Sequence, residues 1–130
     1  MPDPAFLTVE QVKAVHRRMT AEFGGATTLR DPGLLESAVM LPAARFDGKL
    51  LHHGIPAMAA AYLFHIRRNH PFADGNKRTA LASAEIFLLL NGHELDANGD
   101  ALETLTVGVA EGSISKQETV AFFQQFAKSL

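Results

Sequence analysis

The segment from Lys77 to Leu90 constrains the fold more than any other part of the sequence, because it is predicted to be a single helix with a largely apolar surface. It contains neither proline nor glycine, and its last turn, Ile86 to Leu90, is apolar on every side. Helices of this kind are normally buried at the centre of a domain. Asn91 and Gly92 follow at once and form a good left-handed C-cap. We therefore expect a domain built around residues 77–90.

Helix signals recur along the rest of the chain. Thr8 with Gln11 forms a capping box, and Asp31 before Pro32 is a typical helix start, with an end expected near Pro42. Apolar residues at spacings of three and four mark the buried faces. These are Val12, Val15, Met19 and Phe23; Leu34, Leu35, Ala38 and Val39; Ile55, Met58, Tyr62 and Ile66; Leu102, Leu105 and Val109; and, after a capping box of Ser115 with Glu118, Val120, Phe123, Ala127 and Leu130. The sequence predicts an all-α fold, a compact bundle of about six helices around a central buried helix.

Residues 43–54 carry no clean periodicity and are expected to form a loop long enough to act as a mobile flap. The loop contains two neighbouring histidines, His52 and His53. Adjacent side chains point in different directions on a helix or strand, so ordinary loop residues are favoured over a metal site here. Glu85, on the central helix, is either a buried partner for an arginine or part of an exposed face, and both interpretations stay open.

Length and composition exclude several classes of protein. A chain of 130 residues buries roughly two-thirds of the surface that its unfolded form exposes, so residues 1–130 are expected to form a single domain without a stabilising metal or disulfide. The absence of cysteine agrees with a reducing cytoplasm, and no segment resembles a signal peptide or a membrane span. The net charge of −2 gives no overall attraction to nucleic acid. We therefore expect a cytoplasmic protein that binds neither membranes nor nucleic acid directly.

A motif that carries chemistry runs from His70 to Thr79 and reads His-Pro-Phe-Ala-Asp-Gly-Asn-Lys-Arg-Thr. It places a glycine turn before the central helix, whose first backbone N–H groups have no partner within the helix and carry a partial positive charge. Gly75 lets the backbone approach a ligand closely, and Lys77 and Arg78 add full charges. With Asn76, these residues predict a cradle for a polyphosphate.

Two further residues of the motif suit chemistry on a bound nucleotide. Histidine side chains titrate near neutral pH, so His70 is placed to accept a proton from a hydroxyl group. Asp74 is a hard oxygen ligand beside the predicted phosphates, where Mg²⁺ would bridge a carboxylate and a nucleotide, and it is also placed to orient the base. Taken singly, each is an ordinary loop residue. Together they favour the transfer of a nucleotide-derived group.

Residues 70–81 resemble the core motif of the Fic/Doc superfamily, and in particular the death-on-curing (Doc) toxins of type II toxin–antitoxin modules. Fic enzymes that transfer adenylyl groups typically read His-Pro-Phe-x-x-Gly-Asn-Gly-Arg-x-x-Arg. This chain has Lys77 in place of the second glycine and Leu81 in place of the last arginine, as in the Doc branch. Residues 23–42 also look like the N-terminal segment of the family, so the resemblance covers nearly the whole chain.

The Doc resemblance implies the Fic/Doc fold and a kinase-like phosphotransferase activity. ATP would be the substrate, with Mg²⁺ held by Asp74, and the acceptor a serine or threonine of a protein, with translation elongation factor Tu as the expected target and growth arrest as the result. The residues implied to be catalytic are His70, Asp74, Lys77 and Arg78. Those implied to bind phosphate are Arg68, Gly75, Asn76, Lys77 and Arg78. A partner antitoxin is also implied, whose flexible helical segment lies in a groove near the site and blocks it.

Two other functions stay open at this point. An adenylyltransferase on the same fold, which would carry out AMPylation, is disfavoured by Lys77 and Leu81. A binding module without catalysis would use the cradle only to dock a phosphorylated or acidic partner. His70 and Asp74 disfavour it, because simple anion binding needs neither residue.

Overall fold

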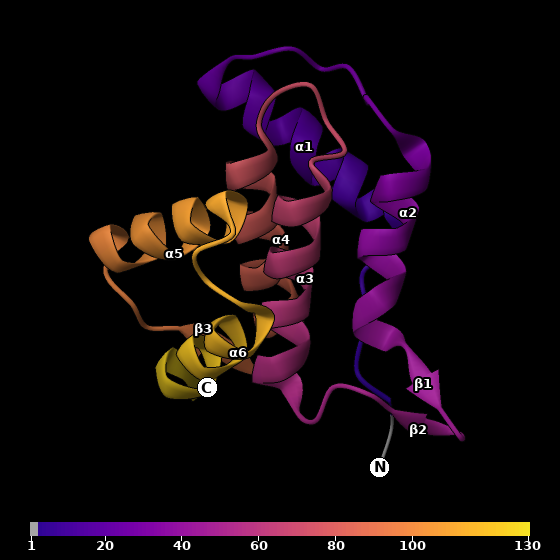
Figure 1. Ribbon diagram of the computed structural model, residues 1–130, viewed down its shortest axis with the longest axis vertical. Coiled ribbons are helices and arrows are strands. Elements are labelled where there is room, and N and C mark those ends of the chain that lie inside the picture. The colour runs from indigo at the N-terminus through magenta and orange to yellow at the C-terminus, as the bar shows by residue number, and fades with distance from the viewer. Residues whose placement is uncertain (1–2) are drawn as a thin grey trace.

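The computed structural model describes residues 3–130, and helices make up most of this part of the chain (Figure 1). Its α-helices are α1 (Val9–Phe23), α2 (Pro32–Met40), α3 (Ile55–Asn69), α4 (Asn76–Leu90), α5 (Gly99–Glu111) and α6 (Lys116–Phe126). The shorter elements are a 3-10 helix (Leu41–Ala43) and the strands β1 (Arg45–Phe46), β2 (Lys49–Leu50), β3 (His93–Leu95) and β4 (Ala127–Ser129). The expected all-α fold is confirmed. Within the described range, no helix combines the length and the apolar content needed to cross a membrane.

The core is centred on α3 and α4, which the loop of residues 70–75 joins. α3 also packs against α2, α5 and α6, and α1 packs against α4. Every residue from Ala57 to Leu63 is buried, and the small alanines among them let the neighbouring helices approach closely. The Tyr62 hydroxyl in this stretch accepts a hydrogen bond from the Leu7 N–H at 2.9 Å, which fastens the N-terminal segment to the core. The loop that carries the chemical motif therefore connects the two best-packed helices.

The last turn of α4 is less buried than the sequence predicts. Phe87 and Leu88 are buried, but Leu89 and Leu90 are 56% and 53% exposed. The interior contacts of α4 lie on one side, which also holds Ala80 and Ala84, so the apolar residues on the other side of the last turn face outward. The prediction that this turn is buried all round is therefore wrong.

The predicted helix starts are confirmed by their capping contacts. Both capping boxes form, at the starts of α1 and α6, and the Asp31 carboxylate accepts from the Leu34 N–H at 3.0 Å. On α1, the buried residues include His16 and Thr20, whereas Phe23 is 56% exposed. The buried stripe follows every fourth residue and leaves Phe23 beside it, so the assignment of Phe23 to the core face is wrong.

The C-terminal segment leaves its helix earlier than the apolar spacing predicts. Residues Ala127 to Ser129 form β4, which pairs antiparallel with β3, so Leu95 lies opposite Ala127. Leu130 continues this pairing, because its N–H donates to the Gly92 oxygen at 2.9 Å. The prediction that Ala127 and Leu130 belong to the last helix is wrong, because pairing with β3 replaces the helical hydrogen bonds.

Within the predicted loop of residues 43–54, residues 45–50 form a hairpin, and residues 51–54 are irregular as expected. β1 and β2 pair antiparallel around Asp47 and Gly48, both at positive φ (53° and 76°), as a tight two-residue hairpin turn requires. The hairpin precedes α3, and His70 follows it, so a helix of about 20 Å separates them (Figure 1). The predicted flap is therefore remote from the chemical motif. Among the described residues, no three histidine, aspartate or glutamate side chains gather as a metal site.

His65 on α3 is held as a neutral imidazole. Its Nε2 atom is buried and has no hydrogen-bond partner within residues 3–130. Burial, reinforced by the positive charge of Lys116 and by His52, lowers the pKa of His65 to about 4. The open question on Glu85 is answered in part: it is half-buried, no ion pair forms with it in the described range, and burial raises its pKa.

Acidification is expected to destabilise the fold through His65. The unfolded chain takes up this proton near pH 6.5 but the folded chain only near pH 4, so stability is lost progressively as the pH falls from 6.5 to 4. One pKa unit corresponds to about 1.4 kcal/mol, and partial exposure of the ring reduces the expected loss to on the order of 1–2 kcal/mol. Urea unfolding at pH 7 and pH 4.5 measures it. The His65→Leu variant should lose less stability than a His53→Gln control; equal losses would contradict the assignment.

Candidate functional site

The loop of residues 70–75 makes two sharp turns that bring His70 and the start of α4 to one depression. His70 ends α3 in the left-handed region (φ 50°, ψ 54°), and Gly75 precedes α4 in the same region (φ 78°). The depression has a volume of about 270 Å³, and its lining is mostly polar. It is lined by Arg67, His70, Ala73, Asp74, Gly75, Asn76, Lys77 and Arg78. The structure thus brings together all but one of the predicted site residues.

The first turn of α4 offers free backbone donors to this depression. No side chain caps the helix, and no acceptor among residues 3–130 is bonded to the N–H groups of Asn76, Lys77 and Arg78. The first bonded amide is that of Thr79, which donates to the Gly75 oxygen at 3.0 Å. Unpaired N–H groups at a helix start favour an anion.

The Asn76 side chain serves the loop rather than a ligand. It is buried, its Oδ1 accepts from the Phe72 N–H at 3.0 Å, and its Nδ2 donates to the Phe72 oxygen at 2.8 Å. These two bonds fasten the loop to the helix that follows it. Asn76 can therefore contact a phosphate through its backbone N–H, whereas its amide group is already committed.

Asp74 is exposed at the edge of the depression. Its Oδ2 accepts from the Ala26 N–H at 2.8 Å, which leaves the other carboxylate oxygen without a bonded partner in the described chain. No hydrogen bond or ion pair joins this carboxylate to the His70 ring, and that ring forms no hydrogen bond within residues 3–130. The suggestion that Asp74 orients the base is therefore not supported by the structure.

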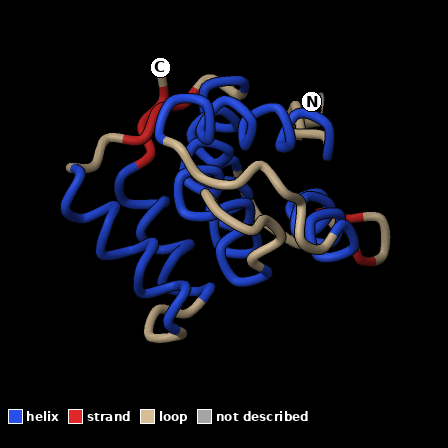
Figure 2. Tube along the Cα trace, turned by 90° about the horizontal axis from the view of Figure 1, so that it is seen from above, coloured by secondary structure: helices blue, strands red, loops and turns tan. Residues whose placement is uncertain are grey.

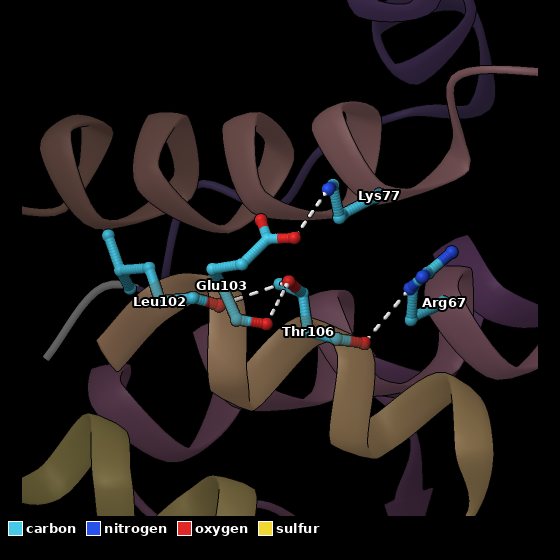
Figure 3. A network of polar contacts seen from close by, with 5 residues as sticks. All are labelled: Arg67, Lys77, Leu102, Glu103 and Thr106. Carbon is cyan, nitrogen blue, oxygen red and sulfur yellow. Dashed lines mark hydrogen bonds and ion pairs between the residues drawn. The ribbon is translucent and has the colours of Figure 1, made fainter. Parts of the chain in front are cut away.

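Two of the cations around the depression are held by α5, as Figure 3 shows. The Lys77 ammonium lies 2.8 Å from Glu103 Oε1, and Arg67 Nε donates to the Thr106 oxygen at 3.0 Å. Burial lowers the pKa of Arg67, an effect that Glu103 opposes. Both cations therefore bridge the rim of the site to α5.

The other two cations differ in where they point. The Arg78 guanidinium lies over the exposed Phe23 ring, 4.4 Å from its centroid, so it points toward the end of α1. Arg68 was expected to contact phosphate, but its Nη1 atom donates to the Val109 oxygen at 3.3 Å and it does not line the depression. One residue along a helix is a rotation of about 100°, so Arg67 and not Arg68 faces the site.

Comparison of the sequence with known proteins identifies relatives of this chain. The sequence model of the Fic/DOC family matches residues 6–88. The chain belongs to the Fic/DOC family. It is 35% identical over 112 residues to "Protein kinase doc" of Escherichia phage P1, covering 84% of this chain and 85% of that protein. It is 46% identical over 78 residues to "Toxin Doc" of Mycolicibacterium smegmatis (strain ATCC 700084 / mc(2)155), and spans 60% of the length of that relative.

The two departures from the adenylyl-transferring Fic pattern lie side by side along α4. Lys77 stands in the first turn, and Leu81 lies one turn further on, where it lines a neighbouring depression of about 240 Å³ together with Leu102. Lys77 and Arg78 line both depressions. The two depressions therefore adjoin at Lys77 and Arg78. The positive charge lies next to His70, and the apolar lining lies further along α4 at Leu81.

Three residues that contact the Fic/DOC motif were missed by the sequence analysis. Arg30 donates to the His70 oxygen, His16 donates to the Asp74 oxygen, and Glu103 pairs with Lys77. Only His16 carried a local signal, since it lies in register with the apolar face of α1 at Val12. The contacts of Arg30 and Glu103 join segments far apart in the sequence, so no local pattern could have indicated them.

The segment that holds Arg30 runs beside the motif loop. The Arg30 and Asp31 N–H groups both donate to the Pro71 oxygen, at 2.8 and 3.0 Å, and the Ala73 N–H donates to the Thr28 oxygen at 3.0 Å. Figure 2 looks onto this end of the molecule, where loop segments cross the helix ends. The motif loop is therefore supported by a second backbone segment along its length.

Proposed function

We propose that this chain is a Doc-type toxin that transfers the γ-phosphoryl group of ATP to a serine or threonine hydroxyl of a protein, with elongation factor Tu as the first candidate target. The observation that carries the proposal is the uncapped start of α4 beside His70, with Lys77 where adenylyl-transferring Fic enzymes have glycine. The phage P1 relative bears the name of a protein kinase, which supports the same reaction class.

His70 is the general base of the proposed reaction. Its ring lines the depression and forms no hydrogen bond within residues 3–130, so it is free to accept the proton of the acceptor hydroxyl. The hydroxyl oxygen forms a bond to the γ-phosphorus, the bond from that phosphorus to the bridging oxygen breaks, and ADP leaves with the bond's electron pair. The hydroxyl proton passes to His70.

The backbone and the cations hold the phosphates. The free N–H groups of Asn76, Lys77 and Arg78 point from the helix start, where developing negative charge on a transferring phosphoryl group is stabilised. Lys77 and Arg78 add charge on the same side. Leu81 offers no cation further along α4, which favours a terminal phosphate close to His70 and a nucleoside directed toward Leu81 and Leu102.

The residues present fit a Mg²⁺ ion that arrives with its nucleotide. Asp74 has one carboxylate oxygen free of internal hydrogen bonds, and the described residues offer no further cluster of acidic ligands. Mg²⁺ usually takes one or two carboxylates and completes its shell with phosphate and water, which matches a single donor. When bound, the ion would neutralise charge on the β- and γ-phosphates.

The position of the transferred label distinguishes this function from its alternatives. The protein would be incubated with Mg²⁺, elongation factor Tu in a bacterial lysate, and ATP labelled at either the α- or the γ-phosphate. We expect γ-label on the target and none after chelation of Mg²⁺ with EDTA. Transfer of α-label would instead establish an adenylyltransferase, and no transfer in either arm would reject the kinase proposal in favour of a binding module.

A cognate antitoxin belongs to the same proposal. The relative from M. smegmatis is named "Toxin Doc". The resemblance to Doc toxins implies action in the cytoplasm together with a partner antitoxin. We expect expression of this chain alone to arrest bacterial growth and co-expression of its cognate antitoxin to restore it. Unimpaired growth at matched protein levels would count against the toxin assignment.

A further inference from the structure

We infer that His16 and Arg30, which lie outside the family motif, are positioning residues that hold the two ends of the loop of residues 70–75. The inference rests on the proposed function, because it assigns them effects on that reaction. Neither side chain lines the depression beside His70, so both act through the backbone that they bind.

Arg30 binds the start of the loop. Its Nε and Nη2 atoms donate to the His70 oxygen at 2.9 and 2.7 Å, and Nη2 also donates to the Asn69 oxygen at 3.2 Å. Carbonyl groups at a helix end lack intrahelical partners and carry partial negative charge, which a guanidinium matches. His70 adopts a positive φ that few non-glycine residues take. Arg30 therefore fixes the direction in which the imidazole leaves the backbone.

His16 supports the end of the loop. A carbonyl oxygen can only accept, so His16 carries its hydrogen on Nε2 and donates to the Asp74 oxygen at 2.8 Å. The buried ring stacks on Phe72 with centroids 3.7 Å apart and planes within 6°. It also lies against Gly75, where an added Cβ would stand 3.4 Å from the ring. His16 thus fixes the peptide that leads into α4 and the direction of its free N–H groups.

The loop does not depend on these side chains for its overall path. Backbone bonds from the segment of residues 28–31 to Pro71 and Ala73, and the Asn76 bonds to Phe72, hold it independently. Loss of either side chain is therefore expected to leave the fold in place and to loosen the local geometry. Misplacement of reacting groups by about 1 Å can cost a factor of about 100 in rate.

The two residues are expected to produce different kinetic effects. Arg30 acts on the backbone of the base, so Arg30→Ala should lower kcat by about 10- to 100-fold with little change in the KM for ATP. His16 acts on the N–H groups that hold phosphate, so His16→Phe, which keeps a stacked ring but no donor, should raise that KM about tenfold. A role in folding alone would produce neither pattern.

The experiment compares these variants with matched controls. His93 donates through Nδ1 to the Asn91 oxygen at 2.9 Å at the other end of α4, and Arg45 donates to the Gly48 oxygen at 3.2 Å in the hairpin. His93→Phe and Arg45→Ala therefore remove the same kinds of bond far from the site. Conservative variants test rescue: Arg30→Lys should recover part of kcat, and His16→Gln, which keeps an N–H donor, part of the KM. Steady-state kinetics and thermal unfolding are measured for each.

The inference is overturned if Arg30→Ala keeps the wild-type kcat. The Arg30 side chain is exposed, so its variants should fold. This test is therefore valid whatever the His16 variants do. It is also overturned if the control variants lose as much activity as the test variants. If the wild-type protein transfers no label, the proposed function fails, and the Kd for MgATP measured by calorimetry decides the His16 assignment. A Kd weakened about tenfold in His16→Phe supports it, and an unchanged Kd rejects it.

Discussion

Replacement of His70 by alanine is expected to lower the rate of phosphoryl transfer by about 10²- to 10⁴-fold, the range that a positioned general base contributes. The side chain is exposed and forms no hydrogen bond within residues 3–130, so its removal breaks no internal hydrogen bond. Arg30 binds the backbone oxygen of His70 and keeps its contacts in the variant. The KM for ATP should therefore change little, because the phosphates are held by the start of α4.

The matched control for this prediction addresses the unusual backbone of His70. Alanine is less tolerant than histidine of the left-handed region, whereas asparagine accepts it readily and offers no base. His70→Asn should therefore lose the same activity as His70→Ala while keeping the melting temperature of the wild-type protein. Both variants should also fail to arrest growth when expressed. A His70→Asn protein that still modifies its target at the wild-type rate would show that the base lies elsewhere.

The helix boundaries were predictable because their signals are local. A capping box requires residues three positions apart, and Asp31 with Pro32 sets a helix start by side-chain chemistry and a fixed φ. The end of the last helix was not predictable in the same way. Ala127 fits a helical spacing, but it pairs with Leu95 on β3, a residue more than thirty positions away in sequence. Long-range pairing overrode the local pattern.

The candidate site also contains features that local sequence predicts and features that depend on distant segments. The contiguous motif from His70 to Arg78 indicated nearly all of the residues that line the depression. The sequence did not indicate what each side chain contacts: Asn76 bonds to the loop instead of a ligand, and Arg68 faces α5. Contacts of this kind depend on helix rotation and on the packing of distant segments, which residue spacing alone does not specify.

Substitution of Asn76 by alanine is expected to have the largest effect on stability. The change removes the partners of the Phe72 N–H and oxygen, both in a buried environment. Each unpaired buried group costs about 1–3 kcal/mol, so a total loss of roughly 2–6 kcal/mol is expected for the two groups. Urea unfolding should report this loss, and the melting temperature should fall by on the order of 10 °C. Any remaining folded protein should transfer phosphate slowly, because Phe72 supports the loop through its stack with His16.

Asn91 provides a matched control at the other end of α4. Its Nδ2 donates to the Phe87 oxygen at 2.8 Å and to the Ala5 oxygen at 3.1 Å, and its Oδ1 accepts from the Ala5 N–H at 2.8 Å. Ala5 is exposed, so water can replace those bonds, and Asn91→Ala should cost about 1 kcal/mol and leave the kinetics unchanged. Equal losses of stability in the two variants would mean that the bonds to Phe72 contribute no more to the free energy of unfolding than bonds at the surface. A fully active, fully stable Asn76→Ala protein would show that the motif loop keeps its shape without them.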